Sequence, residues 1–594
     1  MRRFTVLPLA IVTALAAGPA APLDPVELTA PDAPPDLGRA LRGASLTVAA
    51  QEQGRTDAQD VYAAARQDYA RLLGVLYAAG HYSGVISIRL DGREAADIPA
   101  LQAPATIRRA EVRITAGPPF TFGTARIGPL APDTELPEGF APGAPALSGT
   151  VRAAADTAVL AWREAGHAKA AIARQGLTAD HARARLNADI GVAPGPLTRF
   201  GAIRFVGQER MREGRLAAIA GFPAGAVYSP DQMRRVADRL RRTGVFQSAA
   251  LAEAETLGPG DTLDVTATLI EEAPRRIGFG AEVASFDGVT LTGFWMHRNL
   301  WGGAERLRIA GEVAQIGSQN SGIDYKFAVT YERPATLHPD MALTLALRLA
   351  HVEDRDQNYD SLEIGGEFRR IFSDTVTGRA GLYYRALEVR DTLGPTPFHN
   401  IVLPVGVTWD RRDNAFDATR GTFLDVEAAP YLGFAGTNSG ARLTLDGRAF
   451  QPLGDRVVLA ARVQAGAVLA PALGTTPRSY LFYSGGGGSV RGQPYQSLGV
   501  NVLPGQRTGG MRFLGASAEV RARITGSIGA VAFFDAGSIG AGEFFDAAGG
   551  FHAGAGIGLR YATPIGPIRL DVAAPAGGNT GQGVQIYIGI GQSF

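Results

Sequence analysis

The sequence predicts a fold of small α+β domains followed by a transmembrane antiparallel β-barrel of sixteen strands. The first observation is the stretch 583–594, in which apolar and small or polar residues alternate. Side chains in a strand point to opposite faces in turn, so this pattern places one row toward lipid and the other toward a lumen. The second observation is that such segments follow one another from Arg275 onward. The third is that helical spacing is confined to the residues before about 274.

The barrel prediction depends on a succession of alternating segments of about ten to fourteen residues with turn clusters between them. An even strand count is what an antiparallel outer-membrane barrel needs. A large soluble β-sandwich is the alternative, and an amphipathic edge strand is the alternative for 583–594 alone. Neither explains the aliphatic rows together with the final aromatic residue. The sixteen segments begin near residues 276, 288, 305, 323, 340, 359, 376, 399, 420, 440, 456, 511, 526, 551, 566 and 583.

The residues before the barrel mix helices and strands, most clearly in 200–272. We expect a strand at 200–206, helices at 211–220 and 229–244, and strands at 246–254 and 262–270. For the second helix, Ser229 is the expected N-cap, Pro230 the first helical residue and Gly244 the C-cap. Its apolar positions, which fall at helical spacing and predict a buried stripe, are Met233, Val236, Ala237 and Leu240.

The same unit recurs twice upstream in a weaker form. We expect a helix at 151–165 with strands at 168–174 and 182–190, and a helix at 57–79 with strands at 85–90 and 107–115. A period near 80 residues predicts three modules, at 22–117, 118–196 and 197–273. In each module the helix is followed by a glycine and then by an aromatic residue. The three sequences are Gly80-His81-Tyr82, Gly166-His167 and Gly244-Val245-Phe246.

The start of the chain predicts export. Arg2 and Arg3 precede an apolar run over 4–17 and then small residues, which is the pattern of a signal peptide, expected at 1–21. The chain has no cysteine, so no disulfide or thiolate metal site is expected. A net charge of +1 does not favour nucleic acid as a partner.

The connection between the eleventh and twelfth strands, 471–510, is long and rich in glycine, and it contains Arg491. If this loop folds into the lumen, Arg491 needs carboxylate partners, because an unpaired buried charge is costly. Glu519 and Asp535 follow on strands with lumen parity and are the expected partners. A flexible glycine linker with an exposed arginine is the alternative.

These features resemble a known group of bacterial proteins. The three modules resemble POTRA domains, and Ser489-Val490-Arg491-Gly492 with Tyr495 resembles the loop motif of the BamA and TamA superfamily. In that superfamily the arginine binds acidic residues of neighbouring strands inside the barrel. Two further stretches resemble its mid-barrel and penultimate strands, namely 409–421 and 556–571. Three modules and the ending 585–591 are most similar to the TamA family.

The resemblance implies a function. It implies an outer-membrane protein with POTRA domains in the periplasm, which assembles unfolded β-barrel or autotransporter clients into the lipid bilayer. It also implies a TamB-like partner anchored in the inner membrane. The first and last strands would then form a lateral gate. The glycines of this gate would be Gly278 and Gly280, which face Gly589 and Gly591. Tyr587, Ile590 and Phe594 would form a C-terminal assembly signal.

Other functions remain open at the level of sequence. The gate glycines have an alternative role, which is to relieve crowding in a closed barrel. A two-partner secretion exporter is similar in fold and would more often carry two POTRA modules and a plug helix. A passive porin or receptor would have no evident use for three periplasmic modules. No nucleophile elbow or zinc-binding helix motif occurs, so we expect no enzyme, no cofactor and no metal.

Overall fold

The structure is a computed structural model that describes residues 24–284, 288–318, 322–353, 358–391, 394–503, 506–563 and 566–594. The expected signal peptide, 1–21, lies outside these residues. The chain forms two compact units, and the division between them passes through the third module. The first unit contains the residues up to Ala202 with Pro223–Met233 and Glu253–Val265, and the second contains Ile203–Phe222, Arg234–Ala252 and Thr266–Phe594.

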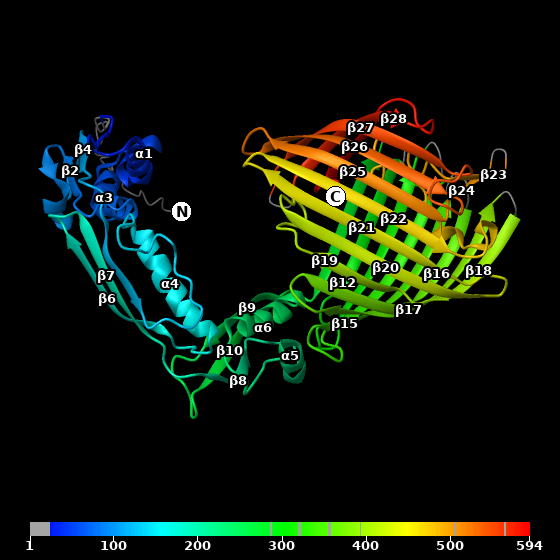
Figure 1. Ribbon diagram of the computed structural model, residues 1–594, viewed down its shortest axis with the longest axis horizontal. Helices are drawn as coiled ribbons and strands as arrows, with labels where there is room; N and C mark the ends of the chain where they lie inside the picture. The colour runs from blue at the N-terminus through cyan, green and yellow to red at the C-terminus, as the bar shows by residue number, and fades with distance from the viewer. Residues whose placement is uncertain are drawn as a thin grey trace, which may run out of the picture. The chain divides into compact units, whose positions relative to one another are not determined.

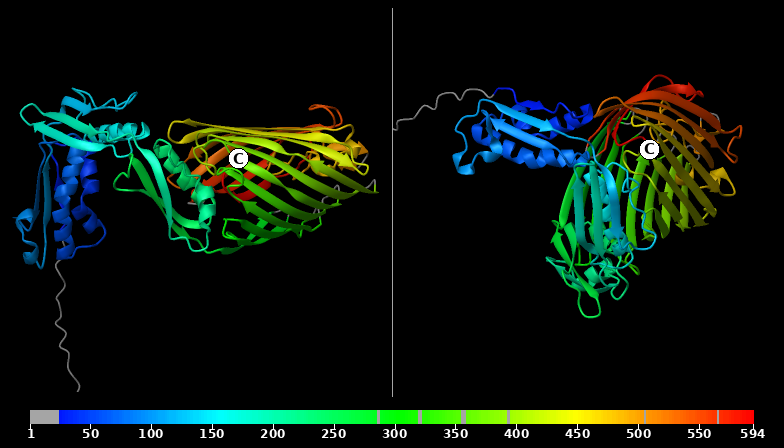
Figure 2. Two further views of the ribbon diagram at one scale, coloured as in Figure 1. Left: turned by 90° about the horizontal axis from the view of Figure 1, so that it is seen from below. Right: turned by 60° about the vertical axis from the view of Figure 1, so that its left-hand side comes forward.

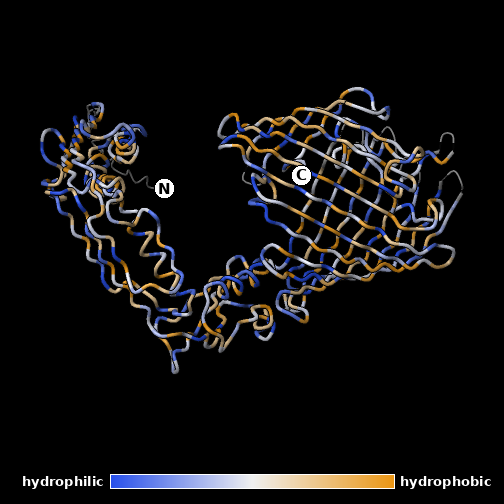
Figure 3. The backbone as a smooth tube through the Cα atoms, viewed as in Figure 1, coloured by the Kyte–Doolittle hydropathy of each residue, from blue (hydrophilic) through white to orange (hydrophobic). Residues whose placement is uncertain are grey.

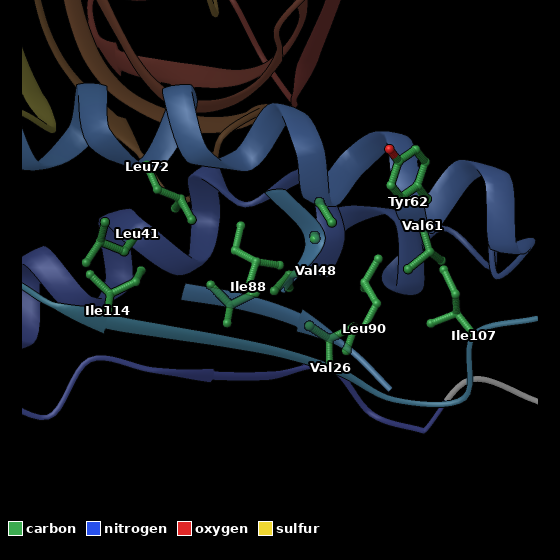
Figure 4. Close-up of a cluster of buried hydrophobic side chains, with 14 of the residues drawn as sticks. Val26, Leu41, Val48, Val61, Tyr62, Leu72, Ile88, Leu90, Ile107 and Ile114 are labelled. Atoms are coloured by element: carbon green, nitrogen blue, oxygen red, sulfur yellow. The ribbon is translucent and has the colours of Figure 1, made fainter. Parts of the chain in front are cut away.

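The first module packs three helices on a four-stranded sheet in the order β1-β4-β2-β3. Figure 4 shows its core, where Val61 and Leu72 of the helix α3 point toward the sheet that contains Ile88 of the strand β2. All three side chains are fully buried, and each such burial contributes about 1.5–3 kcal/mol. The elements are β1 (Glu27–Thr29), α1 (Pro35–Ala44), α2 (Leu46–Glu52), α3 (Ala58–Ala78), β2 (Val85–Leu90), β3 (Arg93–Glu94), η1 (Ala95–Asp97), η2 (Ala100–Gln102) and β4 (Ala110–Thr115).

The second and third modules each have a three-stranded sheet, in the orders β5-β7-β6 and β8-β10-β9. Strands β6 and β7 begin three residues later than the sequence predicts, because turns at 168–169 and 181–184 precede them. The elements are β5 (Thr121–Gly128), α4 (Ser148–Glu164), β6 (Ala171–Asp180), β7 (Arg185–Ala193), β8 (Arg199–Val206), α5 (Glu213–Ala220), α6 (Pro230–Arg242), β9 (Phe246–Glu253) and β10 (Thr262–Glu271).

Helix α6 confirms its sequence signals. It begins at Pro230, and Gly244 follows its end with φ of +66°, a left-handed conformation that glycine adopts at little cost. Three of the four predicted apolar positions, Val236, Ala237 and Leu240, are buried. The fourth, Met233, is half-buried.

The recurring glycine and histidine lie at the junctions between consecutive modules. The amide of Phe120 donates to the carbonyl oxygen of Gly80, and that of Thr198 donates to Gly166, both at 2.9 Å. Nδ1 of His81 and of His167 lies 2.8 Å from the carbonyl oxygen of a glycine in the linker that follows its own module. The repeated sequence signal therefore corresponds to a repeated module junction.

The remaining residues form one antiparallel sheet that curls round into a barrel (Figures 1 and 2). The strands are β11 (Arg275–Ala284), β12 (Gly288–His297), β13 (Arg306–Ile316), β14 (Asp324–Arg333), β15 (Met341–Glu353), β16 (Asn358–Ile371), β17 (Val376–Asp391), β18 (Gly394–Val402), β19 (Val405–Asp410), β20 (Gly421–Phe434), β21 (Gly440–Leu453), β22 (Val457–Leu469), β25 (Arg512–Arg523), β26 (Ile528–Gly540), β27 (Gly550–Tyr561), β28 (Ile568–Gly577) and β29 (Gln585–Ile590).

This sheet has sixteen strand positions, as the sequence predicts. Seventeen strands are described, but β18 and β19 both pair with β17 on one side and β20 on the other, so together they fill one position. Pro404 lies between them and has no amide to give to the ladder. The eighth strand starts at Gly394, earlier than the expected residue 399.

Hydropathy alternates along the barrel strands. Exposed aliphatic and aromatic side chains alternate with polar or small ones, as the colours along the barrel strands in Figure 3 show. On β29, Ile586, Ile588 and Ile590 are more than half exposed on the outer face. This alternation is the pattern expected of strands between lipid and a lumen. In the described residues, no helix has the length and apolar character needed to cross a membrane.

The strand order ends at β11 on one side and at β29 on the other. The sequence predicts that these strands pair over 275–286 and 583–594, and this pairing is not part of the observed order in the described residues. The two strands are short, with ten residues in β11 and six in β29, against sixteen in β17. The chain leaves β29 at Gly591, whose φ is +91°, and turns away from the strand direction. We call the edge between β11 and β29 the seam.

Candidate functional site

The segment between β22 and β25 lies against the inner wall of the barrel. It carries two short 3-10 turns, η3 (Leu473–Thr475) and η4 (Arg478–Tyr480), and a small hairpin of β23 (Val500–Leu503) and β24 (Gln506–Thr508). At its tip Val490 is fully buried and Arg491 is 2 % exposed. The arginine is therefore not on a solvent-exposed linker, and we call this segment the inward loop.

Arg491 is surrounded by three carboxylates from three strands. Its Nε and Nη2 donate to both oxygens of Asp535, at 2.7 and 3.0 Å, and its backbone amide donates to the same group at 3.1 Å. Its Nη1 lies 2.8 Å from Glu519 and 3.2 Å from Asp571. The structure thus brings Arg491 together with both expected carboxylates, and adds Asp571. We call Arg491, Glu519, Asp535 and Asp571 the arginine cluster.

The cluster lies in a setting that excludes water. The three carboxylate side chains are at most 1 % exposed, and Cζ of Arg491 stands 3.5 Å from the ring centroid of Phe533. Charges removed from water in this way stay charged only if the geometry of their partners is good. The bidentate contact with Asp535 supplies that geometry and fixes the direction of the guanidinium plane.

Glycines in β27 make room for the cluster. A Cβ on Gly554 would overlap the carbonyl oxygen of Arg491, and one on Gly556 would stand 2.5 Å from the ring of Phe533. A Cβ on Gly558 would overlap the carboxylate of Asp571. The loop tip therefore packs directly on the strand backbone at Gly554, and the other two glycines leave room for side chains of the neighbouring strands.

Other residues of the loop motif have separate roles. Gly492 has φ of +89°, and a Cβ there would stand 2.5 Å from the carbonyl oxygen of Ala574. The Oγ of Ser489 accepts a hydrogen bond from the amide of Gly485 at 2.9 Å and closes the glycine-rich turn. Tyr495 is 56 % exposed and lies outside the arginine cluster.

Gln493 and His552 hold the loop at a second place, which sequence analysis missed. Both residues are fully buried. Gln493 donates to the carbonyl oxygens of Ala553 and Gly577 at 2.7 and 3.1 Å. His552 has its two ring nitrogens 2.8 Å from the hydroxyls of Ser484 and Thr580. The positions of Gln493 and His552 in the sequence do not predict that they lie close together, because only the fold brings them there.

The glycines on either side of the seam have different surroundings. A Cβ on Gly278 would overlap the ring of Phe294 on the neighbouring strand, so this glycine relieves crowding. Gly280 faces Thr292 in the same ladder, and Gly589 faces Arg569. Gly591 is different, because its positive φ is the turn that takes the chain out of β29.

The three residues expected to form a C-terminal signal have different surroundings. Ile590 is 63 % exposed on the outer face. Tyr587 faces inward, and its hydroxyl accepts a hydrogen bond from the amide of Gly492 at 3.0 Å. Phe594 has the same sequence parity as the aliphatic row, which predicts that it faces lipid. That prediction is wrong. It is only 8 % exposed and packs with Ala418 and Phe450, because the turn at Gly591 breaks the period of two.

Two buried arginines complete the inner wall, and the sequence analysis did not single them out. Arg521 contacts Glu519 at 2.8 Å, and Arg560 contacts Asp571 at 2.5 Å. The three carboxylates of the arginine cluster are therefore accompanied by three guanidinium groups. Their signal in the sequence is charge at lumen parity, next to Glu519 in β25 and after the glycines 554–558 in β27.

Comparisons with known proteins agree with this architecture. Residues 299–594 match the family model described as Omp85 superfamily domain. Residues 198–271 match the POTRA model, which is described as surface antigen variable number repeat.

Solved structures with this fold include two kinds of protein. The crystal structure of BamA from Haemophilus ducreyi lacking POTRA domains 1-3 is 16% identical, with a TM-score of 0.59, and the match covers 79% of this chain and 98% of that chain. CdiB from Acinetobacter baumannii is 12% identical and CdiB from Escherichia coli 14%, each with a TM-score of 0.50, and both matches cover 80% of this chain and 90% of theirs. At these identities the likeness concerns the fold. With a POTRA domain directly before a matching barrel that holds an inward loop, this chain belongs to the Omp85 superfamily.

Proposed function

We propose that this protein inserts β-barrel or autotransporter clients into the outer membrane by letting their strands pass between β11 and β29, as in the TamA family. The observation that carries the proposal is the open end of the strand order at these two strands. Unpaired backbone groups are costly in hydrocarbon, so a client strand that pairs with a seam edge gains hydrogen bonds by β-augmentation. Membership of the superfamily supports insertion or translocation of proteins as the general activity.

The periplasmic part completes the proposal. We propose that the first two modules are POTRA domains like the third, and that all three lie in the periplasm. Their sheets have edge strands, and most residues of β6 are exposed. Such an edge is suited to pairing with a client in transit or with a β-rich, TamB-like partner anchored in the inner membrane.

A two-partner secretion exporter is the second candidate. The fold alone does not separate it from an assembly factor. Two observations favour assembly: three small modules precede the barrel, and each α-helix in the described residues contributes to the core of a module. In the described residues the lumen is occupied by the inward loop, whose helical segments are two short 3-10 turns.

A reversible crosslink across the seam tests the proposal. The chain has no cysteine, so Gly280→Cys with Gly589→Cys can be joined by a cleavable bifunctional maleimide in the full-length protein. The protein is then reconstituted in liposomes with a small, urea-unfolded outer-membrane barrel as the probe. We expect insertion of the probe to stop when the crosslink is present and to return when it is cleaved.

The matched control joins β28 to β29 and leaves the seam open. Val572→Cys and Ile586→Cys are partners in that ladder, both on the outer face. This pair should leave insertion unchanged. Undiminished insertion with the seam crosslinked would refute a lateral gate. Loss of transport of a secreted chain, with normal insertion of the probe, would favour the exporter.

A further inference from the structure

The residues after β29 are packed into the barrel interior. We call Gly591–Phe594 the tail. The amide of Gly591 donates to the carbonyl oxygen of Pro567 at 2.7 Å, and the amide of Gln592 donates to that of Phe416 at 3.2 Å. The ring of Phe594 lies 6.4 Å from that of Phe450, centroid to centroid. The tail therefore has a defined position, and this position keeps the end of β29 turned into the lumen.

Arg521 contacts both the arginine cluster and the tail. Its Nε and Nη2 each stand 2.8 Å from Oε2 of Glu519. The same Nη2 donates to the carbonyl oxygen of Phe594 at 3.2 Å, and its Cζ lies 5.4 Å from the Phe594 ring centroid. Arg521 is 6 % exposed, so these contacts are made out of bulk water.

Arg560 makes a second and separate bridge. Its Nη1 contacts Asp571 at 2.5 Å, and its Nε donates to Oε1 of Gln592 at 2.8 Å. Gln592 in turn donates to Asp417 at 2.9 Å. Arg560 is 5 % exposed. Two arginines on different strands thus reach from the cluster carboxylates to the tail.

Arg491 shares those carboxylates with the two bridging arginines. Glu519 is placed between Arg491 and Arg521, and Asp571 between Arg491 and Arg560. If Arg491 leaves, Glu519 keeps only Arg521 as a counterion. Asp571 likewise keeps only Arg560. Each bridging arginine is then drawn toward its carboxylate and away from the tail. Buried ionic networks respond as a unit to the loss of one member.

We propose that Arg521 and Arg560 are positioning residues that couple the inward loop to the seam. With the loop in place they hold the tail inside the barrel and keep β29 short. When the loop withdraws, the tail is released and β29 can extend toward β11. This inference rests on the proposed function for its use in client assembly, but the position of the tail can be measured with no client present.

The test uses the full-length protein in detergent with Ser593→Cys as the reporter. A polyethylene-glycol maleimide reaches this half-buried position only when the tail leaves the interior. We expect Arg491→Ala to raise the labelling rate roughly tenfold, within the usual range of coupling between two sites. Arg521→Gln and Arg560→Gln should do the same. Gly554→Ala, which displaces the loop without changing charge, replaces Arg491→Ala if that variant fails to assemble.

Two controls separate coupling from general damage. Arg379→Gln breaks another lumen ion pair, with Asp425 and Glu427, and should leave the labelling rate unchanged. The double variant Arg491→Ala with Arg521→Gln should label no faster than the faster single variant, because both act on one network. Additive effects, or equal labelling in Arg379→Gln, would overturn the coupling.

The reciprocal measurement places the reporter on the loop. Removal of residues 591–594 should raise labelling of Val490→Cys, a position that is fully buried while the loop is in place, since coupling between two sites acts in both directions. An exposed loop with a protected tail in Arg491→Ala would refute the inference and leave the proposed function untouched. A released tail with full insertion of the probe in Arg521→Gln would support the coupling and contradict its use at the seam.

Discussion

At the scale of single residues, Arg491 matters because three strands depend on its charge. Removal of one partner from a buried ion cluster usually costs about 3–5 kcal/mol, since the remaining charges stay desolvated. We expect Arg491→Ala to leave the barrel inserted but to loosen the inward loop and impair function. Protease cleavage within 471–510 measures the loosening. Arg456→Ala, in an exposed turn, is the control, and equal cleavage of the Arg491→Ala variant and the unmodified protein would contradict the prediction.

The glycines under the loop make a second prediction at this scale. A methyl group on Gly554 would overlap the backbone of Arg491, and overpacking of this kind costs about 1–3 kcal/mol. We therefore expect Gly554→Ala to increase cleavage of the loop with every charge intact. Gly488→Ala is matched in chemistry, and a Cβ there has no atom within 4 Å. If both variants behave alike, close packing on β27 is not what holds the loop.

At the scale of elements, the part of helix α6 from Arg234 onward docks on a turn of the barrel, and both belong to the second unit. Arg239 and Arg242 contact Asp340 at 2.6 and 2.8 Å, and the side chains of Arg239 and Asp340 are 10% and 14% exposed. We expect Asp340→Asn to increase hydrogen exchange of α6 strongly, by the loss of a largely buried pair. Asp374→Asn removes an exposed pair with Arg234 and should change exchange little.

The same pair gives a pH prediction. Burial alone would raise the pKa of Asp340, but hydrogen bonds from Arg239 and Arg242 outweigh it and lower the pKa to about 2. A lowered pKa stabilises the docked state above the ordinary Asp value near 3.9, and this stabilisation is lost as the pH falls toward 2. Exchange of α6, corrected for its intrinsic rate, should therefore be flat from about pH 8 to 5. A rise in exchange within that range would show that another group controls the docking.

At the scale of the whole molecule, the sheet of sixteen positions should behave as a folded outer-membrane barrel. Such barrels satisfy their backbone groups between strands, so they resist detergent until they are heated. Protein purified from outer membranes should migrate differently in semi-native electrophoresis before and after heating. Identical migration would mean that no stable barrel is present.

The sequence by itself determined the barrel because each strand carries its own evidence. The period of two gave the start of most strands to within two residues, and the count of sixteen positions is confirmed. The start, the end and the apolar stripe of α6 were readable for the same reason, since Pro230 and Gly244 act on neighbouring residues. Arg491, Glu519 and Asp535 were found because buried charge must be paired.

Only the tertiary structure decided how distant elements meet. Asp571, Arg521 and Arg560 complete the inner wall, although 80 residues separate Asp571 from Arg491. The turn at Gly591 interrupts the period of two, so Phe594 departed from its expected position. The eighth strand is divided at Pro404 and starts earlier than expected, at Gly394. Local pattern fixes which face a side chain takes, but long-range packing decides which strands pair and which charges share a partner.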